Sequence, residues 1–284
     1  MIARTARKAL SRLGVRKALL RFGAHWYPAH EPHVVQTTVR GVKLLVFANE
    51  DVGRRLVFLR QYEPDDADFL ASLVRPADVC FDIGGNTGLY AMLMAKRATD
   101  GEVHAFEPVP LNRHLLASGA LLNGFKHIVV NECAVGAEDG EMSFSEAVDG
   151  AYSSLVPVGR KSERSALLVK VRSLDSYVAE KEMPRVDVMK VDVEGAEPLV
   201  LQGAAGLFGA SERRPRAIML ELLDINLSTY GTNVMEIVER MRGFSYHPYV
   251  AATGEGVRAF SASDCNRVTN IFFLTDDARK AIGK

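Results

Sequence analysis

The sequence is poor in cysteine and contains no long apolar run. Its three cysteines, Cys80, Cys133 and Cys265, are odd in number and widely spaced, which argues against a disulfide framework and matches no zinc or redox motif. No uninterrupted apolar stretch approaches the ~20 residues that a membrane-spanning helix requires. Cys80 and Cys133 lie within apolar runs, so we interpret them as small core side chains, and we expect a cytoplasmic protein.

The sequence also has no net charge. Lys and Arg together number 35, and so do Asp and Glu, so the charge of the whole molecule indicates no nucleic-acid partner, and we expect none. No internal repeat or low-complexity tract is present, and the 48% of hydrophobic residues are typical of a folded globular protein. A chain of 284 residues can form one large domain with an additional arm.

The balance of charge conceals a basic N-terminus. The first acidic residue is Glu31, and seven cations precede it. They are Arg4, Arg7, Lys8, Arg12, Arg16, Lys17 and Arg21. Leu10, Leu13, Ala18 and Leu20 lie between them at roughly helical spacing, which predicts an amphipathic helix. We expect this helix to pack against its own domain or to form a homodimer contact. The alternatives are peripheral contact with an anionic membrane and a role as a transit peptide.

The pattern of apolar residues divides the chain near residue 75. In residues 1–75 the basic helix is followed by a predicted hairpin, Val34–Val39 and Val42–Phe47, and by a helix over Pro64–Leu73, which together form an N-terminal cap. In residues 76–284 short apolar strands alternate with helices, as in a doubly wound, mostly parallel α/β sheet. The predicted strands are Asp78–Ile83, Glu102–Phe106, His127–Val135, Val186–Val191 and Ala217–Leu222. The predicted helices are Leu89–Arg97, Pro110–Asn123, Ala196–Phe208 and Val234–Arg242.

Two segments depart from this alternation. Phe244–Val250 and Arg267–Leu274, connected through the Gly254–Gly256 region, predict a closing antiparallel hairpin. Ser143–Ala166 interrupts the alternation and is interpreted as a loop that leaves the sheet and shapes a substrate pocket.

A glycine-rich turn follows the first strand of the sheet. Gly84, Gly85, Asn86 and Gly88 come directly after Asp82, at the sheet edge where open α/β folds bind ligands. A dinucleotide fingerprint would require glycines at positions 86 and 89, which hold asparagine and leucine. A dinucleotide-dependent oxidoreductase is therefore disfavoured. The Asp82 carboxylate would repel a pyrophosphate and attract the ammonium or sulfonium of S-adenosylmethionine.

The ends of the next two strands extend this predicted cofactor site. Glu107 can accept hydrogen bonds from both ribose hydroxyls, and Pro108 then turns the chain away. Cys133 and Ala134 can line the adenine face, with Glu138 or Asp139 near its exocyclic amine.

The fourth strand ends in a cluster of charged residues. On an extended strand, Lys190, Asp192 and Glu194 project to one side. Glu197 lies in the first turn of the next helix, where its negative charge interacts favourably with the helix dipole. Asp192 or Glu194 is predicted to accept a proton from an acceptor alcohol or to hold a divalent metal, and both options stay open. Glu221 and His247 are further candidates, His247 as a base or substrate contact.

These motifs together resemble the FkbM-type methyltransferases. The resemblance spans Val79 to Leu222 and depends on Phe81–Gly88, Ala105–Pro108, Leu174–Ser176 and Lys190–Glu197. It implies a class I methyltransferase fold and O-methylation of a hydroxyl on a sugar, glycolipid or polyketide-type natural product. It also implies that the methionine end lies near Asp82, Gly84 and Asn86, the ribose on Glu107, and the reaction centre beside Asp192 and Glu194. Gly85 departs from the family, which usually has alanine there. A catalytically silent partner protein and an N- or carboxyl-methyltransferase are the alternatives.

Overall fold

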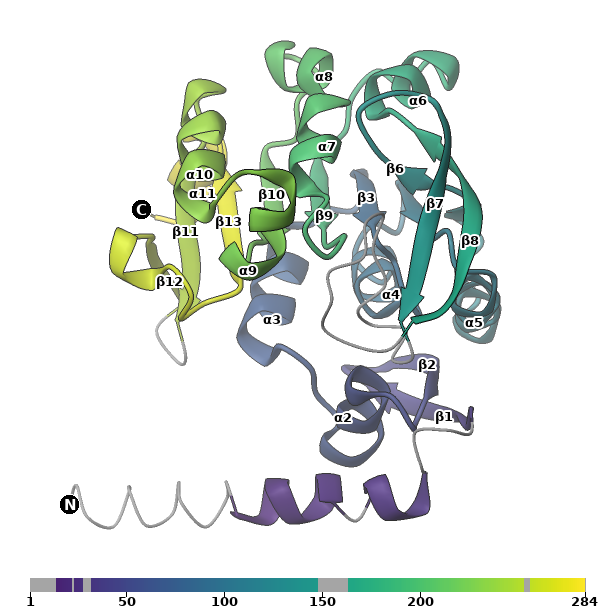
Figure 1. The fold of residues 1–284 in the computed structure, drawn as a ribbon. Coiled ribbons are helices and arrows are strands. Elements are labelled where there is room, and N and C mark those ends of the chain that lie inside the picture. The colour runs from purple at the N-terminus through teal and green to yellow at the C-terminus, as the bar shows by residue number, and fades with distance from the viewer. Residues whose placement is uncertain (1–13, 22, 28–31, 148–162, 253–255, 284) are drawn as a thin grey trace, which may run out of the picture.

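The computed structural model describes residues 14–21, 23–27, 32–147, 163–252 and 256–283. A central twisted sheet with helices on both faces stands above a smaller cap, and the N-terminal helix lies along the base of the cap (Figure 1). None of the described helices has the length and apolar character needed to cross a membrane.

The central sheet has eight strands in the order β12-β11-β13-β10-β9-β3-β4-β5. In that order the strands are β12 (Gly256–Ala259), β11 (His247–Ala252), β13 (Asn270–Leu274), β10 (Ala217–Glu221), β9 (Val188–Val191), β3 (Val79–Ile83), β4 (Glu102–Phe106) and β5 (Ile128–Asn131). The run from β10 to β5 is parallel, whereas β13, β11 and β12 are each antiparallel to a neighbour. The prediction of a mostly parallel, doubly wound α/β sheet is confirmed.

Helices cover the sheet on both faces. They are α4 (Leu89–Ala95), α5 (Pro110–Asn123), α6 (Leu174–Glu180), α7 (Glu197–Gln202), α8 (Ala205–Gly209), α9 (Asp224–Leu227), α10 (Val234–Gly243) and α11 (Asp276–Ala281), with short 3-10 turns at Ser228–Tyr230 and Ala262–Asp264. Successive strand residues point to opposite faces, and Cys80 accordingly packs in the core that contains Met92 of α4, whereas Phe81 packs in the core that contains Val200 of α7. Each face of the sheet therefore has its own hydrophobic core.

The cap is built from a hairpin and two helices. β1 (Val34–Val39) pairs antiparallel with β2 (Val42–Phe47), as predicted, and α3 (Pro64–Leu73) has the predicted bounds. The helix α2 (Asp51–Leu59) was not predicted. Leu44, Leu56 and Leu70 of the cap belong to the same hydrophobic core as Met92, so the cap is packed onto the sheet. The division of the chain into domains at residues 75 and 76 stays a prediction.

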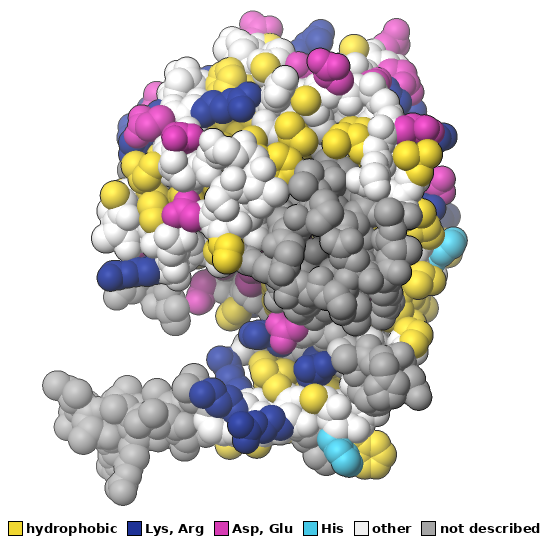
Figure 2. Space-filling view, viewed as in Figure 1, with side chains coloured by type: hydrophobic (Ala, Val, Ile, Leu, Met, Phe, Trp, Pro, Cys, Tyr) yellow, Lys and Arg dark blue, Asp and Glu magenta, His cyan; other side chains and the backbone are white. Residues whose placement is uncertain are grey.

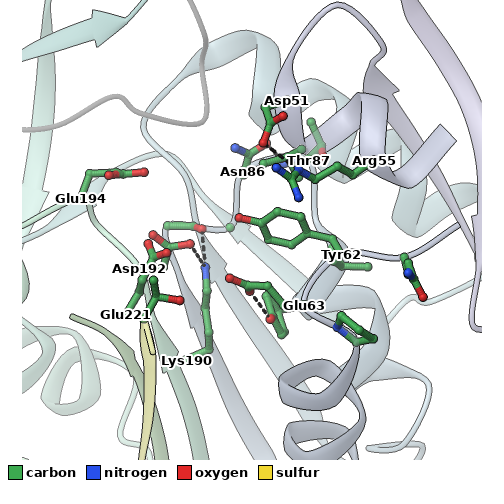
Figure 3. Close-up of a pocket in the computed structure, with 18 of the residues that line it drawn as sticks. Asp51, Arg55, Tyr62, Glu63, Asn86, Thr87, Lys190, Asp192, Glu194 and Glu221 are labelled. Carbon is green, nitrogen blue, oxygen red and sulfur yellow. Dashed lines mark hydrogen bonds and ion pairs between the residues drawn. The ribbon is translucent and has the colours of Figure 1, made fainter. Parts of the chain in front are cut away.

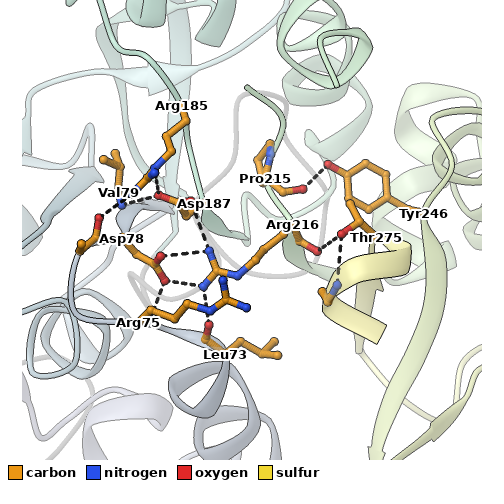
Figure 4. Close-up of polar contacts among 12 residues, drawn as sticks. Leu73, Arg75, Asp78, Val79, Arg185, Asp187, Pro215, Arg216, Tyr246 and Thr275 are labelled. Carbon is orange, nitrogen blue, oxygen red and sulfur yellow. Dashed lines mark hydrogen bonds and ion pairs between the residues drawn. The ribbon is translucent and has the colours of Figure 1, made fainter. Parts of the chain in front are cut away.

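A polar cluster joins the cap to the edge of the sheet at which the parallel strands begin (Figure 4). The Arg216 guanidinium donates to the Leu73 carbonyl oxygen at the end of α3 (2.7 Å) and to the Asp78 carboxylate (3.0 Å), and it pairs with Asp187 (3.3 Å). Asp187 in turn accepts the backbone N–H of Val79 at 2.9 Å. One partly buried arginine thus fixes the start of β3 and the end of α3 together.

Two predicted elements are divided in the structure. His127–Val135 was predicted as one strand, but it forms β5 and then β6 (Ala134–Val135), which pairs with a different sheet. Ala196–Phe208 was predicted as one helix, but it breaks between α7 and α8. A Cβ at Gly203 would lie 2.1 Å from the Gly136 carbonyl oxygen, so close backbone packing accounts for the glycine at that break.

The predicted C-terminal hairpin is also corrected. β11 and β13 do pair antiparallel, but β13 inserts between β10 and β11, and β12 is added on the outer edge. Residues 253–255, which were expected in the connection, lie outside the described part of the chain.

Ser143–Ala166 is not a simple loop. β7 (Gly140–Ala147) pairs antiparallel with β8 (Glu163–Arg172), and together with β6 they form a separate three-stranded sheet. The segment therefore leaves the central sheet as predicted, but its two ends are strands. Residues 148–162 lie outside the described residues, so the expected role in shaping a pocket stays a prediction.

Candidate active site

A cavity of about 470 Å³ lies between the cap and the carboxyl edge of the parallel strands. From the sheet edge, Gly84, Asn86, Lys190, Asp192 and Glu221 line it. On the opposite side it is lined by Arg55, Tyr62 and Glu63 of the cap and by Arg16 of the N-terminal helix. Figure 3 shows the acidic side chains of the sheet edge facing those of the cap across this space. The cavity therefore joins the predicted cofactor turn, the predicted reaction centre and the cap.

The glycine-rich turn has the backbone conformation that its sequence requires. Gly84 and Gly88 have φ values of 76° and 93°, in the left-handed region that favours glycine. The N–H groups of Gly84 and Gly85 both donate to the Phe106 carbonyl oxygen, at 3.1 and 3.0 Å. A Cβ at Gly84 would lie 1.8 Å from the Asp192 carbonyl oxygen. The absence of a side chain at Gly84 thus lets the loops after β3 and β9 touch.

Glu107 supports this turn from the adjacent strand end. Its Oε2 accepts the N–H of Asn86 at 2.7 Å, and its Oε1 accepts the N–H of Val109 at 2.8 Å. Burial raises the pKa of Glu107 to about 7. Each carboxylate oxygen has a further lone pair after these two bonds, so the geometry is compatible with the predicted ribose contact, which stays a prediction.

Lys190 lies at the centre of the site. Its Nζ is 3.2 Å from Asp192 Oδ2 and 3.6 Å from Asp82 Oδ1, and it donates to the Gly84 carbonyl oxygen at 2.9 Å. The Nζ also lies 5.3 Å from the centroid of the Tyr90 ring. Burial by itself would lower the pKa of Lys190, but the carboxylates of Asp192 and Asp82 raise it above its usual value. Lys190 is therefore charged and holds the two strand ends together.

Strand register explains this arrangement. Asp82 and Lys190 are directly opposite in the parallel pair β3–β9. Asp82 is fully buried, and neither of its oxygens has a hydrogen-bond partner in the described part of the chain. Burial raises the pKa of Asp82, and the charge of Lys190 opposes that rise. Asp82 does not line the cavity itself. It therefore contributes to the site indirectly, through its ion pair with Lys190 and its place before the glycine turn.

Three carboxylates meet at the end of β9 and β10. Asp192, Glu194 and Glu221 each place an oxygen within 4.8 Å of the others. Carboxylates this close can share a proton or hold a divalent cation. Burial raises the pKa of Glu221 well above its usual value, and the negative charge of Asp192 raises it further. Burial and the neighbouring Asp192 thus favour the protonated form of Glu221, while Lys190 lies 3.2 Å from Asp192.

The chain does not continue as an extended strand through this cluster. β9 ends at Val191, and Glu194 has a φ of 55°, in the left-handed region. The Glu194 carboxylate accepts a hydrogen bond from Asn226 Nδ2 at 3.0 Å. The predicted alignment of Lys190, Asp192 and Glu194 along one strand face is wrong in detail, although all three line the same cavity.

The sequence did not identify the contribution of the cap. The Tyr90 hydroxyl donates to Glu63 Oε2 at 2.6 Å, and burial raises the pKa of Glu63. Glu63 immediately precedes α3, and Tyr90 lies on α4. At the mouth, Arg55 pairs with Asp51 at 2.8 Å. No local motif marks these residues, because only the packing of the cap onto the sheet brings them to the site.

His247 is not part of this site, and its candidacy as a catalytic residue is corrected. In the sheet, His247 pairs with Leu274, and Leu274 also pairs with Ala217 on its other side. His247 is therefore level with Ala217, the first residue of β10, whereas Glu221 of the site is the last. Four residues of strand separate the two levels by about 13 Å. His247 instead pairs with Asp276 at 3.0 Å.

The residues predicted at the adenine end are buried beside the three-stranded sheet. Cys133 and Ala134 are 6% and 7% exposed, and neither they nor Pro108 line the described cavity. Asp139 accepts the Ser173 N–H at 2.7 Å and pairs with Arg172 at 3.0 Å, and these contacts lower its pKa. Asp139 therefore stabilises local structure, and the adenine contacts of Cys133 and Ala134 stay predictions.

Glu197 closes the turn that carries the reaction centre. Its Oε1 accepts the N–H groups of Val193 and Gly195 at 3.1 and 3.2 Å, which goes beyond the predicted interaction with the helix dipole. Burial raises the pKa of Glu197 from 4.5 to about 7. The folded state thus binds this proton more tightly than the unfolded state, so Glu197 contributes stability at low pH that is lost as the pH rises through about 7.

We expect Glu197→Gln to remove this pH dependence. The unfolding free energy of the variant relative to the native protein should rise by roughly 1–3 kcal/mol between pH 4.5 and pH 8. Urea unfolding across that range measures the difference, with the 60% exposed Glu239 replaced by Gln as the control. A difference that stays constant with pH would contradict the assignment.

Known proteins resemble the chain over the same region. The sequence matches the family described as Methyltransferase FkbM domain over residues 82–247, more than half of the chain. The 31-O-demethyl-FK506 methyltransferase FkbM of Streptomyces tacrolimicus is 27% identical over 209 residues, 61% of this chain and 74% of that protein. The hexuronic acid methyltransferase AglP of Haloferax volcanii is 28% identical over 141 residues, 50% of this chain and 56% of that protein.

Among solved structures, the SAM dependent methyltransferase from Agrobacterium tumefaciens has a TM-score of 0.46 and 13% sequence identity, and the match covers 84% of this chain and 69% of that one. The family match includes the glycine turn, Glu107 and the charged end of β9. The chain therefore belongs to the FkbM methyltransferase family.

Proposed function

We propose that this protein is an S-adenosylmethionine-dependent O-methyltransferase that acts on a hydroxyl of a small molecule, either a sugar or a natural product. The observation that carries the proposal is the placement of Asp192 between the glycine turn and the cap, in one cavity with Lys190 and Glu221. A cofactor on the turn and an acceptor under the cap would meet at Asp192.

The residues of the site fit the cofactor. The turn at Gly84 brings its backbone to the cavity with no side chain in the way, and Asn86 and Thr87 line the same wall. The Asp192 carboxylate lines the cavity and would attract the cationic end of the cofactor. Glu107 would hold the ribose through its free lone pairs, with Cys133 and Ala134 toward the adenine.

The chain's own residues account for the movement of the proton. When bound, S-adenosylmethionine supplies an electrophilic methyl carbon. Asp192 would accept the proton of the acceptor's hydroxyl group as that hydroxyl becomes a nucleophile. Lys190, 3.2 Å away, holds the Asp192 carboxylate in place. The cap excludes water and aligns the hydroxyl, and such positioning supplies much of the rate of a methyl transfer.

The names of the relatives support an acceptor of this kind. One relative is named for the compound FK506 and another for hexuronic acid. The walls of the present cavity carry Glu63, Glu194 and Glu221, whose carboxyl groups could form hydrogen bonds with the hydroxyl groups of such an acceptor.

Calorimetric titration with S-adenosylhomocysteine tests the proposal, with a nicotinamide nucleotide as the control ligand. We expect micromolar binding of the first and none of the second. Glu107→Ala should weaken the binding roughly 10- to 100-fold, because it removes the hydrogen-bond acceptor for the ribose and frees the Asn86 N–H that it holds.

Glu102→Ala, which changes a 58% exposed glutamate on the same strand, is the matched control and should bind like the native protein. Thermal unfolding verifies that both variants are folded. Unchanged affinity in a folded Glu107→Ala would exclude the ribose contact, and binding of the nicotinamide nucleotide alone would overturn the whole proposal.

A further inference from the structure

The N-terminal helix carries cationic and apolar side chains into solvent. Residues 14–21 are helical, and within them Arg16, Lys17 and Arg21 are exposed. Val15 and Leu19 are 59% and 38% exposed, and they are four residues apart, so they share one face of the helix. Figure 2 shows Lys and Arg side chains gathered at this base of the molecule, with a hollow between them and the body.

The same helix is attached to the cap beside the cavity. A Cβ at Gly23 would lie 2.4 Å from the Phe58 ring of α2, so this glycine packs directly against the ring. Arg16 lines the cavity together with Arg55 of α2. The cationic helix therefore forms one border of the opening through which an acceptor would enter.

We propose that this helix docks on an anionic lipid surface, and that the enzyme takes an acceptor that is exposed at that surface. The proposal rests on the proposed function for the nature of the acceptor. Charge complementarity selects a lipid surface as the occupant, because seven cations precede the first acidic residue, Glu31. Exposed apolar side chains such as Val15, Leu19 and the 62% exposed Trp26 would enter the interface, as in helices that lie in the plane of a membrane.

Sedimentation of the full chain with vesicles tests this inference without cofactor or acceptor. We expect binding to vesicles of phosphatidylcholine with phosphatidylglycerol, little binding to phosphatidylcholine alone, and weaker binding as salt is added. Arg21→Glu reverses one charge next to the surface and should weaken the binding about 30-fold. Lys280→Glu makes the same change at a 74% exposed site on α11 and should have no effect.

Leu19→Glu tests the apolar face and should also weaken binding, whereas Leu121→Glu, at an 83% exposed leucine of α5, should not. Absence of binding to the anionic vesicles would overturn the inference. Light scattering offers a second way to overturn it. If the protein forms a dimer that Leu19→Glu dissociates and Leu121→Glu does not, a second copy of the chain, and not a lipid surface, covers the helix. Because binding of S-adenosylhomocysteine is measured separately, failure of the membrane contact is distinguishable from failure of the proposed function.

Discussion

Replacing Asp192 by asparagine is expected to lower kcat by about 10²- to 10⁴-fold, the usual contribution of a positioned proton acceptor. Asparagine keeps the shape of the side chain but cannot take the hydroxyl proton. Lys190 retains its contact with Asp82 at 3.6 Å, so the variant should fold and bind S-adenosylhomocysteine with nearly native affinity. Steady-state kinetics with an accepted sugar or natural product, together with calorimetry, separates the two effects.

Asp276→Asn is the matched control for that measurement. Asp276 is 60% exposed and pairs with His247 at the opposite edge of the sheet, so its replacement should leave kcat unchanged. A folded Asp192→Asn enzyme with kcat within about threefold of native would exclude Asp192 as the proton acceptor and direct attention to Glu194 or Glu63.

Replacing Gly84 by alanine is expected to destabilise the protein by about 3–5 kcal/mol and to abolish cofactor binding. The φ of 76° is unfavourable for alanine, and the added Cβ would lie 1.8 Å from the Asp192 carbonyl oxygen. That oxygen belongs to the backbone and cannot turn aside, so the loops after β3 and β9 must separate. Urea unfolding and calorimetry with S-adenosylhomocysteine measure the two losses.

Gly85→Ala is the control, because the neighbouring position carries a much weaker constraint. A Cβ there would meet Leu116 Cδ1 at 2.9 Å, the end of a flexible side chain that can move. Gly85 does not have a positive φ, and the family usually has alanine at this place. We expect a change of at most about 1 kcal/mol. Equal losses in the two variants would show that the contact with Asp192 is not what requires Gly84.

Much of the fold follows from local sequence. The bounds of β1, β2, α3, β4 and α5 were predicted to the residue, since alternating or helical apolar patterns end at turn residues and prolines. The errors in the strand order have a common cause. β6 joins a second sheet with β8, and β13 inserts between β10 and β11, and both depend on pairing between segments far apart in the chain.

The same distinction holds for the site. The sequence by itself determined the glycine turn, Glu107 and the acidic strand ends, because the residues that bind a ligand in a parallel sheet follow each strand directly and carry a local pattern. Only the tertiary structure decided that Lys190 lies beside Asp82, that Glu63 and Tyr90 face the reaction centre, and that His247 lies at the far edge. Strand register and the packing of the cap set these contacts, and neither leaves a periodic signal in the chain.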